Sequence, residues 1–208
     1  MPMFPLGMVI FPHQTVGLCV FEPRYRQMLH DLSNDNAEFG SCLIARGSEV
    51  GGGDERTMVG TVMSIVASQP LADGQTLLMV EGQRCIEVAE WVPDAPYPRA
   101  RVTERCCDEV EIERDLLKSA ESAVRALRAL HSEVNLDESP LPMDDLSGDP
   151  ATRAWQLCAM TPMAVLDQFA VLSLSDPNER LRLVAEICCE RYGDYQRLLA
   201  EPSGGDWS

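Results

Sequence analysis

The chain has 208 residues, of which 45% are hydrophobic and 24% charged, and its formal net charge is −16. No apolar run approaches the roughly 18 residues of a membrane-spanning helix, and the negative charge argues against nucleic acid as a partner. The amino terminus lacks the basic segment of a secretory signal, so we expect a soluble, cytoplasmic protein that does not bind membranes.

The first hundred residues predict β-strands. Six apolar-rich runs of strand length are separated by Gly, Pro, Asp or Asn, which favours a compact six-stranded barrel. Asp73 and Gly74 lie between two of these runs and predict a hairpin. The six runs are Thr15 to Phe21, Phe39 to Ala45, Thr57 to Ala67, Gln75 to Val80, Arg84 to Val92 and Arg99 to Val102.

One helix interrupts the predicted strands. Pro23 suits the first turn of a helix, and Tyr25, Met28, Leu29 and Leu32 then recur on one helical face. We expect this helix to plug the barrel.

From Asp108 onward the apolar residues recur at helical spacing. Asp108 and Glu111 predict a capping box, and three further helices are predicted to begin at Asp149-Pro150, Thr161-Pro162 and Asp176-Pro177. These patterns divide the chain into a barrel subdomain at residues 1–105, a helical bundle at residues 106–200 and a flexible tail at residues 201–208. The acidic excess lies mainly in the second half, where it either solvates helix faces or favours basic polypeptides.

The sequence shows no motif for nucleotide hydrolysis or peptide cleavage. A Walker A loop and a Ser-Lys dyad both require a suitably placed lysine, and the single lysine, Lys118, lies on a predicted exposed helix turn. We therefore expect no catalytic residue and no cofactor.

The eight cysteines are scattered through apolar runs without the spacing of a zinc site, so we expect buried thiols and no metal. Catalysis by a cysteine nucleophile remains an alternative, in which Cys19 or Cys42 would pair with His13 or His30.

An ordered set of short motifs resembles the Lon protease N-terminal, substrate-binding domain family. The set begins with Phe4-Pro5-Leu6-Gly7-Met8-Val9-Ile10-Phe11-Pro12 and continues with Leu18 to Arg26, Phe39-Gly40, Val59-Gly60-Thr61, Val80 to Arg84 and Pro96-Tyr97. It covers residues 4 to 102, and the later helices resemble the family's trailing bundle. The motif residues to which we give a structural role are Pro5, Pro12, Phe21, Glu22, Arg24, Tyr25, Gly60 and Arg84.

The resemblance implies an α+β fold, with a PUA-like (pseudouridine-synthase-and-archaeosine-like) β-barrel followed by a helical bundle. It also implies a non-catalytic module that binds unfolded or extended polypeptide. Such a module would be free-standing, without the ATPase and peptidase of Lon, and would act as an adaptor or client-recognition protein in proteolysis. The sequence departs from the family's usual pattern at His13 and Cys85.

Most of the motif residues have a structural explanation. Pro5, Pro12 and Gly60 suit backbone turns, and Phe11, Phe21 and Tyr25 have the size of core residues. Glu22 and Arg24 flank a helix start, where Glu22 is expected to form an ion pair with Arg84.

Polypeptide would bind in a groove between barrel and bundle, or by strand addition at an exposed sheet edge. We expect the contact residues near the barrel mouth, at Met8, Phe11, His13 and Tyr97, where apolar side chains accompany prolines. Two alternatives stay open. One is a small-molecule binder or thiol enzyme built around Cys42 or Cys85, and the other is an RNA-binding PUA-like module, which the net charge disfavours.

Overall fold

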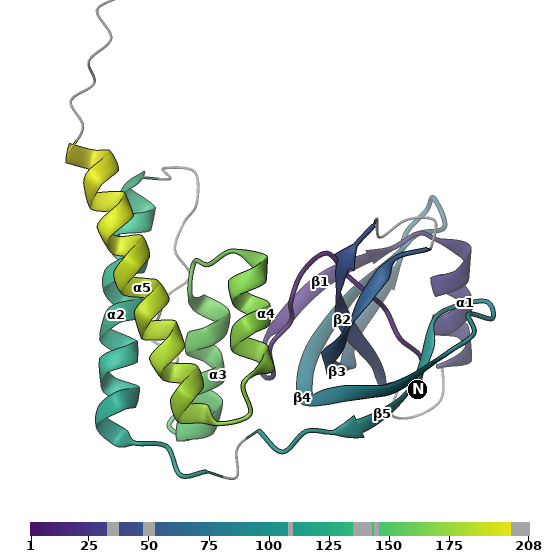
Figure 1. Cartoon of the computed structure of the whole chain (residues 1–208). Helices are drawn as coiled ribbons and strands as arrows, with labels where there is room; N and C mark the ends of the chain where they lie inside the picture. Colours follow the sequence, from purple (N-terminus) through teal and green to yellow (C-terminus); the bar gives the residue numbers. More distant parts are fainter. Residues whose placement is uncertain (33–37, 48–52, 108–109, 135–142, 144–145, 201–208) are drawn as a thin grey trace, which may run out of the picture.

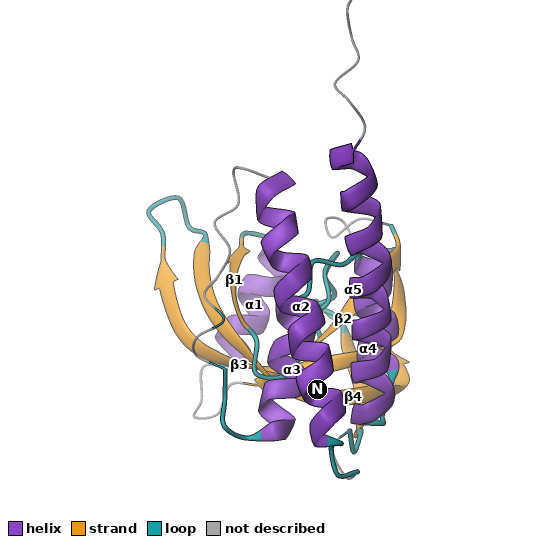
Figure 2. Cartoon of the chain, turned by 90° about the vertical axis from the view of Figure 1, so that its left-hand side faces the viewer, coloured by secondary structure: helices purple, strands orange, loops and turns teal. Residues whose placement is uncertain are grey.

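The computed structural model describes residues 1–32, 38–47, 53–107, 110–134, 143 and 146–200. An antiparallel sheet and helix α1 (Pro23–Asp31) form one half of the molecule (Figure 1). The other half consists of helices α2 (Arg114–Val134), α3 (Pro150–Met160), α4 (Val165–Ser173) and α5 (Pro177–Ala200). Helix α4 lies next to the sheet, and α2 and α5 run side by side on the far side of the bundle (Figures 1 and 2). None of the described helices has the length and apolar character needed to cross a bilayer.

Among the described residues the sheet has five strands, and every pairing between them is antiparallel. The strand order is β1-β4-β3-β2, and β5 pairs with the second half of β4. Strands β3 and β4 form the predicted hairpin, whose turn contains Gly74 with a φ of 80°, a conformation that glycine adopts readily. The strands are β1 (Thr15–Val20), β2 (Glu38–Arg46), β3 (Glu55–Pro70), β4 (Thr76–Val92) and β5 (Arg99–Glu104).

The prediction of six strands was wrong because two of the predicted runs form one strand. Strand β4 continues through Gly82, where the sequence indicated a break. The glycine is needed for a close approach instead of a turn, since a Cβ there would lie 2.2 Å from the carbonyl oxygen of Phe11. The amide of His13 donates to the Gly82 carbonyl, and the amide of Gly82 donates to the Gln14 carbonyl. The N-terminal segment thus crosses β4 at this glycine.

The predicted closed barrel is also not formed by these strands, because β1 and β2 stand at the two ends of the strand order. Residues 1–6 cover the outer edge of β2. The amide of Leu6 donates to the Cys42 carbonyl over 2.9 Å, and the amide of Met3 donates to Pro98, just before β5. This segment therefore connects β2 to β5 through isolated bridges. The PUA-like classification of the fold stays a prediction.

Helix α1 begins at Pro23 as predicted and covers one end of the sheet (Figure 1). Tyr25 and Met28 are its buried residues. The Tyr25 ring packs against Phe4, with ring centroids 4.2 Å apart, and both belong to the core between the helix and the sheet. Tyr25 of the family motif therefore supplies core packing.

The start of α2 differs from the predicted capping box. The helix begins at Arg114, and Asp108 lies outside the described residues. Asn178 at the start of α5 holds the preceding backbone instead. Its side-chain oxygen accepts from the amide of Glu113 over 2.9 Å, and its side-chain nitrogen donates to the carbonyl of Glu111 over 3.0 Å. Asn178 thus fixes the backbone ahead of α2 through a contact from α5.

Two of the three predicted proline starts are confirmed, at Pro150 and Pro177. Thr161-Pro162 was wrong, because α4 begins only at Val165. Thr161 ends α3 instead, and its buried hydroxyl donates to the carbonyl of Leu157 over 2.7 Å. This bond to the preceding turn uses the hydroxyl that would otherwise cap a new helix.

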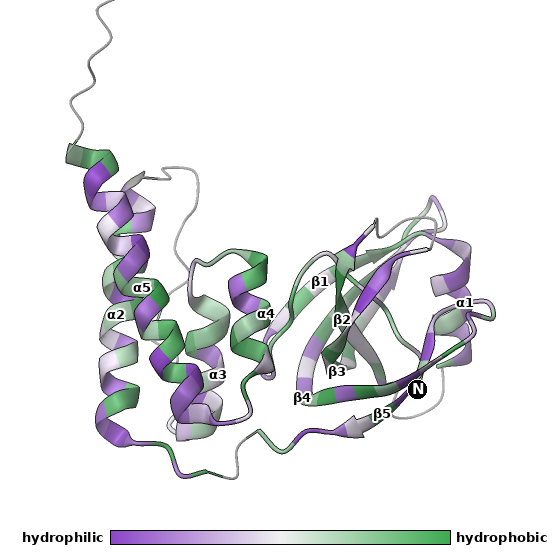
Figure 3. Ribbon diagram, in the orientation of Figure 1, coloured by the Kyte–Doolittle hydropathy of each residue, from purple (hydrophilic) through white to green (hydrophobic). Residues whose placement is uncertain are grey.

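The two halves share a hydrophobic core. Phe11 from the N-terminal segment lies against Trp155 of α3, and the core continues into the apolar parts of α3 and α4 (Figure 3). The guanidinium of Arg105, which follows β5, donates over 2.8 Å to the Ser173 carbonyl at the end of α4. Sheet and helices are thus joined by apolar packing and by hydrogen bonds.

Candidate functional site

Exposed apolar side chains gather on the outer face of β1 and the first half of β4. Leu77 and Met79 are 44% and 43% exposed, and they lie beside Cys19 and Gly17, their partners in β1. Phe21 comes directly after β1 and is 51% exposed. Because directly paired residues place their side chains on the same face of a sheet, these apolar residues form one surface.

A groove of about 150 Å³ borders this surface between β1 and the N-terminal segment. Met8, 37% exposed, and Phe21 lie at its rim, while Leu6 and Leu18 are buried below them. We call Met8, Phe21, Leu77 and Met79 the apolar surface. The arrangement can accept an apolar group in the groove while the outer face contacts more of the same ligand. Other residues that line the groove are Phe4, Gly17, Cys19, Val20, Glu22 and Tyr25.

The structure does not bring the four predicted contact residues together. Met8 lies in the groove, and His13 is exposed where the N-terminal segment crosses β4. Phe11 is buried against Trp155, so the expectation that it surfaces at the barrel mouth was wrong.

Tyr97 is also buried, and its hydroxyl donates to the Asp31 carboxylate of α1 over 3.0 Å. Its expected exposure was therefore wrong as well. Burial and the bond to Asp31 raise the pKa of Tyr97. Tyr97 helps to hold α1 against the end of the sheet, away from the apolar surface.

The family motif at the start of α1 is divided between core and surface. Phe21 was expected to be core, but it is the most exposed member of the apolar surface. Glu22 forms an ion pair with Arg24 over 3.1 Å, and Arg24 stacks on the ring of Tyr25 at 4.5 Å from its centroid. The predicted ion pair between Glu22 and Arg84 is therefore wrong.

Arg84 instead joins two strands. Its guanidinium donates two hydrogen bonds of 2.8 Å to the carboxylate of Glu38 in β2, and it also lies 3.4 Å from a carboxylate oxygen of Glu104 in β5. These hydrogen bonds hold the pKa of Glu38 below its usual range. The role of Arg84 is therefore to form ion pairs with acidic residues on two other strands.

The other motif residues serve packing. Pro5 and Pro12 are buried. Gly60 is fixed by a close approach, since a Cβ there would lie 2.0 Å from the carbonyl oxygen of Ser41 on the paired strand. Its role is therefore the tight contact between β2 and β3 and not a turn.

The buried thiols have an unreactive setting. Burial raises the pKa of Cys42 to about 12, and a hydrogen bond with Cys107, together with burial, raises the pKa of Cys85. A cysteine nucleophile reacts as the thiolate, which both environments disfavour. Cys19 is exposed, and its thiol donates to the side-chain oxygen of Gln75 over 2.9 Å.

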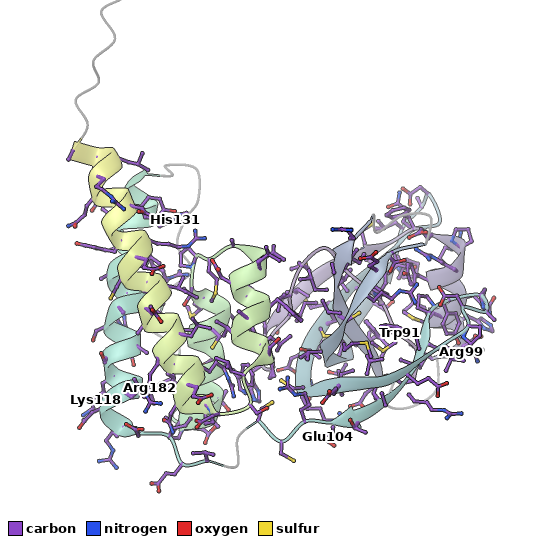
Figure 4. All side chains as sticks on the ribbon, viewed as in Figure 1. Trp91, Arg99, Glu104, Lys118, His131 and Arg182 are labelled. Atoms are coloured by element: carbon purple, nitrogen blue, oxygen red, sulfur yellow. The ribbon has the colours of Figure 1, made fainter. Side chains whose placement is uncertain are left out.

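The single lysine offers no catalytic base near these cysteines. Lys118 lies on α2 in the helical half, far from the apolar surface (Figure 4). Within the described part of the chain, no group of three His, Cys, Asp or Glu side chains is placed to hold a metal ion.

Comparison with known proteins identifies the family. The family model described as the ATP-dependent protease La (LON) substrate-binding domain matches residues 1–190. Lon protease 2 of Desulfotalea psychrophila is 26% identical over an alignment of 196 residues that covers 89% of this chain and 24% of that protein. Lon protease of Escherichia coli K12 is 25% identical over 190 residues, 86% of this chain and 23% of that protein. The chain thus spans about a quarter of the length of these relatives.

Two solved structures have the same fold. The Lon N-terminal domain protein from Xanthomonas campestris superposes with a TM-score of 0.65 at 24% identity, over 89% of this chain and 96% of that one. The N-terminal domain of Mycobacterium avium complex Lon protease gives a TM-score of 0.64 at 17% identity, over 91% and 97% of the two chains. Since the family model covers most of its length, this chain belongs to the LON substrate-binding domain family.

Proposed function

We propose that this protein recognises polypeptide substrates without catalysing their cleavage, and that the apolar surface is where they bind. The observation that carries the proposal is the continuity of this surface. Leu77 and Met79 on the sheet adjoin β1, and Phe21 and Met8 continue the surface into the groove. Soluble proteins rarely leave large apolar side chains grouped and exposed unless they bind something there.

The family supports polypeptide as the ligand, because the substrates of a protease are polypeptides and the matching model describes a substrate-binding domain. The formal charge of −16 disfavours RNA, the alternative drawn from the PUA-like resemblance. The raised pKa values of Cys42 and Cys85 count against a thiol enzyme. Polypeptide binding is thus the function that these observations favour together.

We further propose that the protein acts as an adaptor or client-recognition module in proteolysis. Its relatives carry about three quarters of their length beyond the matched part and bear the name of a protease. A recognition module of this kind increases the local concentration of a client near a protease, which requires binding and no chemistry of its own.

A binding assay with an unfolded protein tests the proposal. Fluorescence anisotropy would follow dye-labelled casein as the purified protein is added, with Leu77→Ser and Met79→Ser as variants. Because apolar residues at the centre of an interface contribute most of its affinity, each substitution is expected to weaken binding at least several-fold. Leu166→Ser on α4, which removes a side chain that is 75% exposed in the other half of the molecule, is the matched control.

Equal binding by all three variants and the parent would contradict the proposed surface. Release of peptides from casein, abolished by a substitution within this chain, would contradict the proposed absence of catalysis.

A further inference from the structure

Strand β1 is an edge strand without the protection that such strands usually carry. Exposed edges are normally blocked by charged side chains, proline or bulges, because their unpaired amides and carbonyls attract other strands. The six residues Thr15–Val20 contain no charged residue and no proline, and their pairing with β4 runs without a register shift. Residues 1–6 cover the outer edge of β2, whereas no described strand pairs with the outer edge of β1.

The register shows which β1 amides point to this edge. The amide of Gly82 donates to the Gln14 carbonyl, so Gln14 and Gly82 form a hydrogen-bonded pair of the antiparallel ladder. Hydrogen-bonded pairs recur at every second residue, which directs Val16 and Leu18 toward β4. The intervening residues, including Gly17, direct their amides and carbonyls away from β4, toward the side on which the groove separates β1 from the N-terminal segment.

From this arrangement we propose that a polypeptide substrate binds as an added strand along the outer edge of β1, with one large apolar side chain in the groove beside Met8 and Phe21. The backbone edge selects an extended segment of little sequence preference, since it bonds to main-chain groups. The groove, about 150 Å³, has the volume of a cavity that holds a single benzene ring. The substrate class is therefore an extended segment that contains a phenylalanine-sized residue. This inference rests on the proposed function and specifies how the polypeptide is held.

The charge of the protein favours a foreign segment over a second copy of this chain. Two copies joined edge to edge would bring together two formal charges of −16. Like charges oppose such association, whereas a neutral or basic segment is attracted. Between the first residue of β1 and Phe21 the edge itself has no charged side chain that would repel such a segment.

A peptide designed for this edge tests the inference. It has roughly nine residues, of alternating threonine and valine with one central phenylalanine and a lysine at each end, which is long enough to span β1. Two derivatives carry N-methyl groups on alternate amides, one on each of the two possible sets. An added strand presents only one set of its amides to β1, so we expect one derivative to lose at least about tenfold in affinity and the other to bind nearly as well as the parent peptide. Replacing the central phenylalanine by serine should cost about tenfold as well.

Gly17 provides the matching pair of protein variants. Gly17→Pro removes an amide that points away from β4 and leaves the ladder intact, and Gly17→Ala keeps the amide. A Cβ at Gly17 would meet no atom within 4 Å, so the space for the alanine side chain is open. We expect Gly17→Pro to weaken peptide binding at least about tenfold relative to Gly17→Ala, because only the proline variant lacks the amide. If Gly17→Pro fails to fold, the two methylated peptides decide the question with the unaltered protein.

The outcomes separate this inference from the proposed function. If both methylated peptides and Gly17→Pro bind normally while Phe21→Ser loses binding, the apolar surface binds polypeptide without strand addition, and the inference is overturned alone. If neither the peptide nor unfolded casein binds, the proposed function falls too. A dimer in sedimentation experiments that Gly17→Pro dissociates would assign the edge to a second copy and also overturn the inference.

Discussion

Phe11 of the N-terminal segment packs against Trp155 of α3, with ring centroids 6.2 Å apart, and so places the beginning of the chain in the core of the helical half. Both rings are almost completely buried. We therefore expect the sheet and the helical bundle to depend on each other for stability.

Phe11→Ala is therefore expected to destabilise the whole protein by about 3–5 kcal/mol, because it leaves a cavity between the two halves. Urea unfolding followed by far-UV circular dichroism and by tryptophan fluorescence would measure the loss. We propose that both signals change in one transition, since the halves share one core. Phe21→Ala, at an exposed position, is the control and should change stability by less than about 0.5 kcal/mol. Separate transitions for sheet and helices would contradict the joint core.

Gly82→Ala is expected to destabilise the fold by about 1–3 kcal/mol. The added Cβ would lie 2.2 Å from the Phe11 carbonyl oxygen, and backbone must move to relieve the clash. Gly17→Ala is the matched control, because it adds the same methyl group to a strand where nothing lies within 4 Å. The difference between the two unfolding midpoints in urea measures the effect. Equal midpoints would show that the crossing of the N-terminal segment over β4 is looser than described.

The ion pair between Arg84 and Glu38 should give a pH-dependent contribution to stability. Hydrogen bonds from Arg84 lower the pKa of Glu38 in the folded state, so the pair stabilises the fold above the ordinary glutamate pKa. That contribution is lost as the pH falls through the lowered folded value, where the carboxylate becomes protonated. Since both side chains are partly exposed, it should not exceed about 1 kcal/mol at neutral pH. A double-mutant cycle of Arg84→Gln and Glu38→Gln, measured at several pH values, checks this, and a coupling energy that grows toward acid pH would have the wrong sign.

The cysteines should divide into two classes by reactivity. Cys19, Cys106 and Cys189 are exposed, whereas Cys42 is buried with a pKa raised to about 12. Brief treatment of the native protein with iodoacetamide at neutral pH should therefore alkylate the three exposed residues first. Mass spectrometry of tryptic peptides locates the label, and a sample unfolded in urea, in which all eight thiols react, is the control. Early labelling of Cys42 would revive the thiol-enzyme alternative.

Local patterns predicted the helix starts well where the cap and the helix are neighbours in sequence. Asp149 accepts from the amide of Thr152, as its position before Pro150 indicated. Thr161 was misjudged because its hydroxyl bonds to the turn before it, and α2 begins late because Asn178 binds the backbone ahead of it. In both cases a contact outside the local pattern decided the outcome.

The apolar surface was only partly predictable. Met8 was expected and found there, but Leu77 and Met79 were missed, because the run from Leu77 to Val80 has no polar residue to mark its outer face. Polar and apolar residues usually alternate in an antiparallel strand with one exposed face. The uninterrupted apolar run was therefore the available signal for exposed apolar side chains on this strand. Phe11 was given both a core role and a surface role, and only the core role is confirmed. Its core partner Trp155 lies on a helix that begins far along the chain, so this contact could not be read from the sequence.

The position of Phe11 in the shared core has a consequence for the chain while it is being synthesised. The segment around Phe11 is made well before its core partners Leu181 and Val184 in α5. The nascent chain therefore carries an apolar segment without its full set of neighbours until α5 has been made. A protein with the proposed function would have to be kept from its own clients, or from aggregation, during that interval.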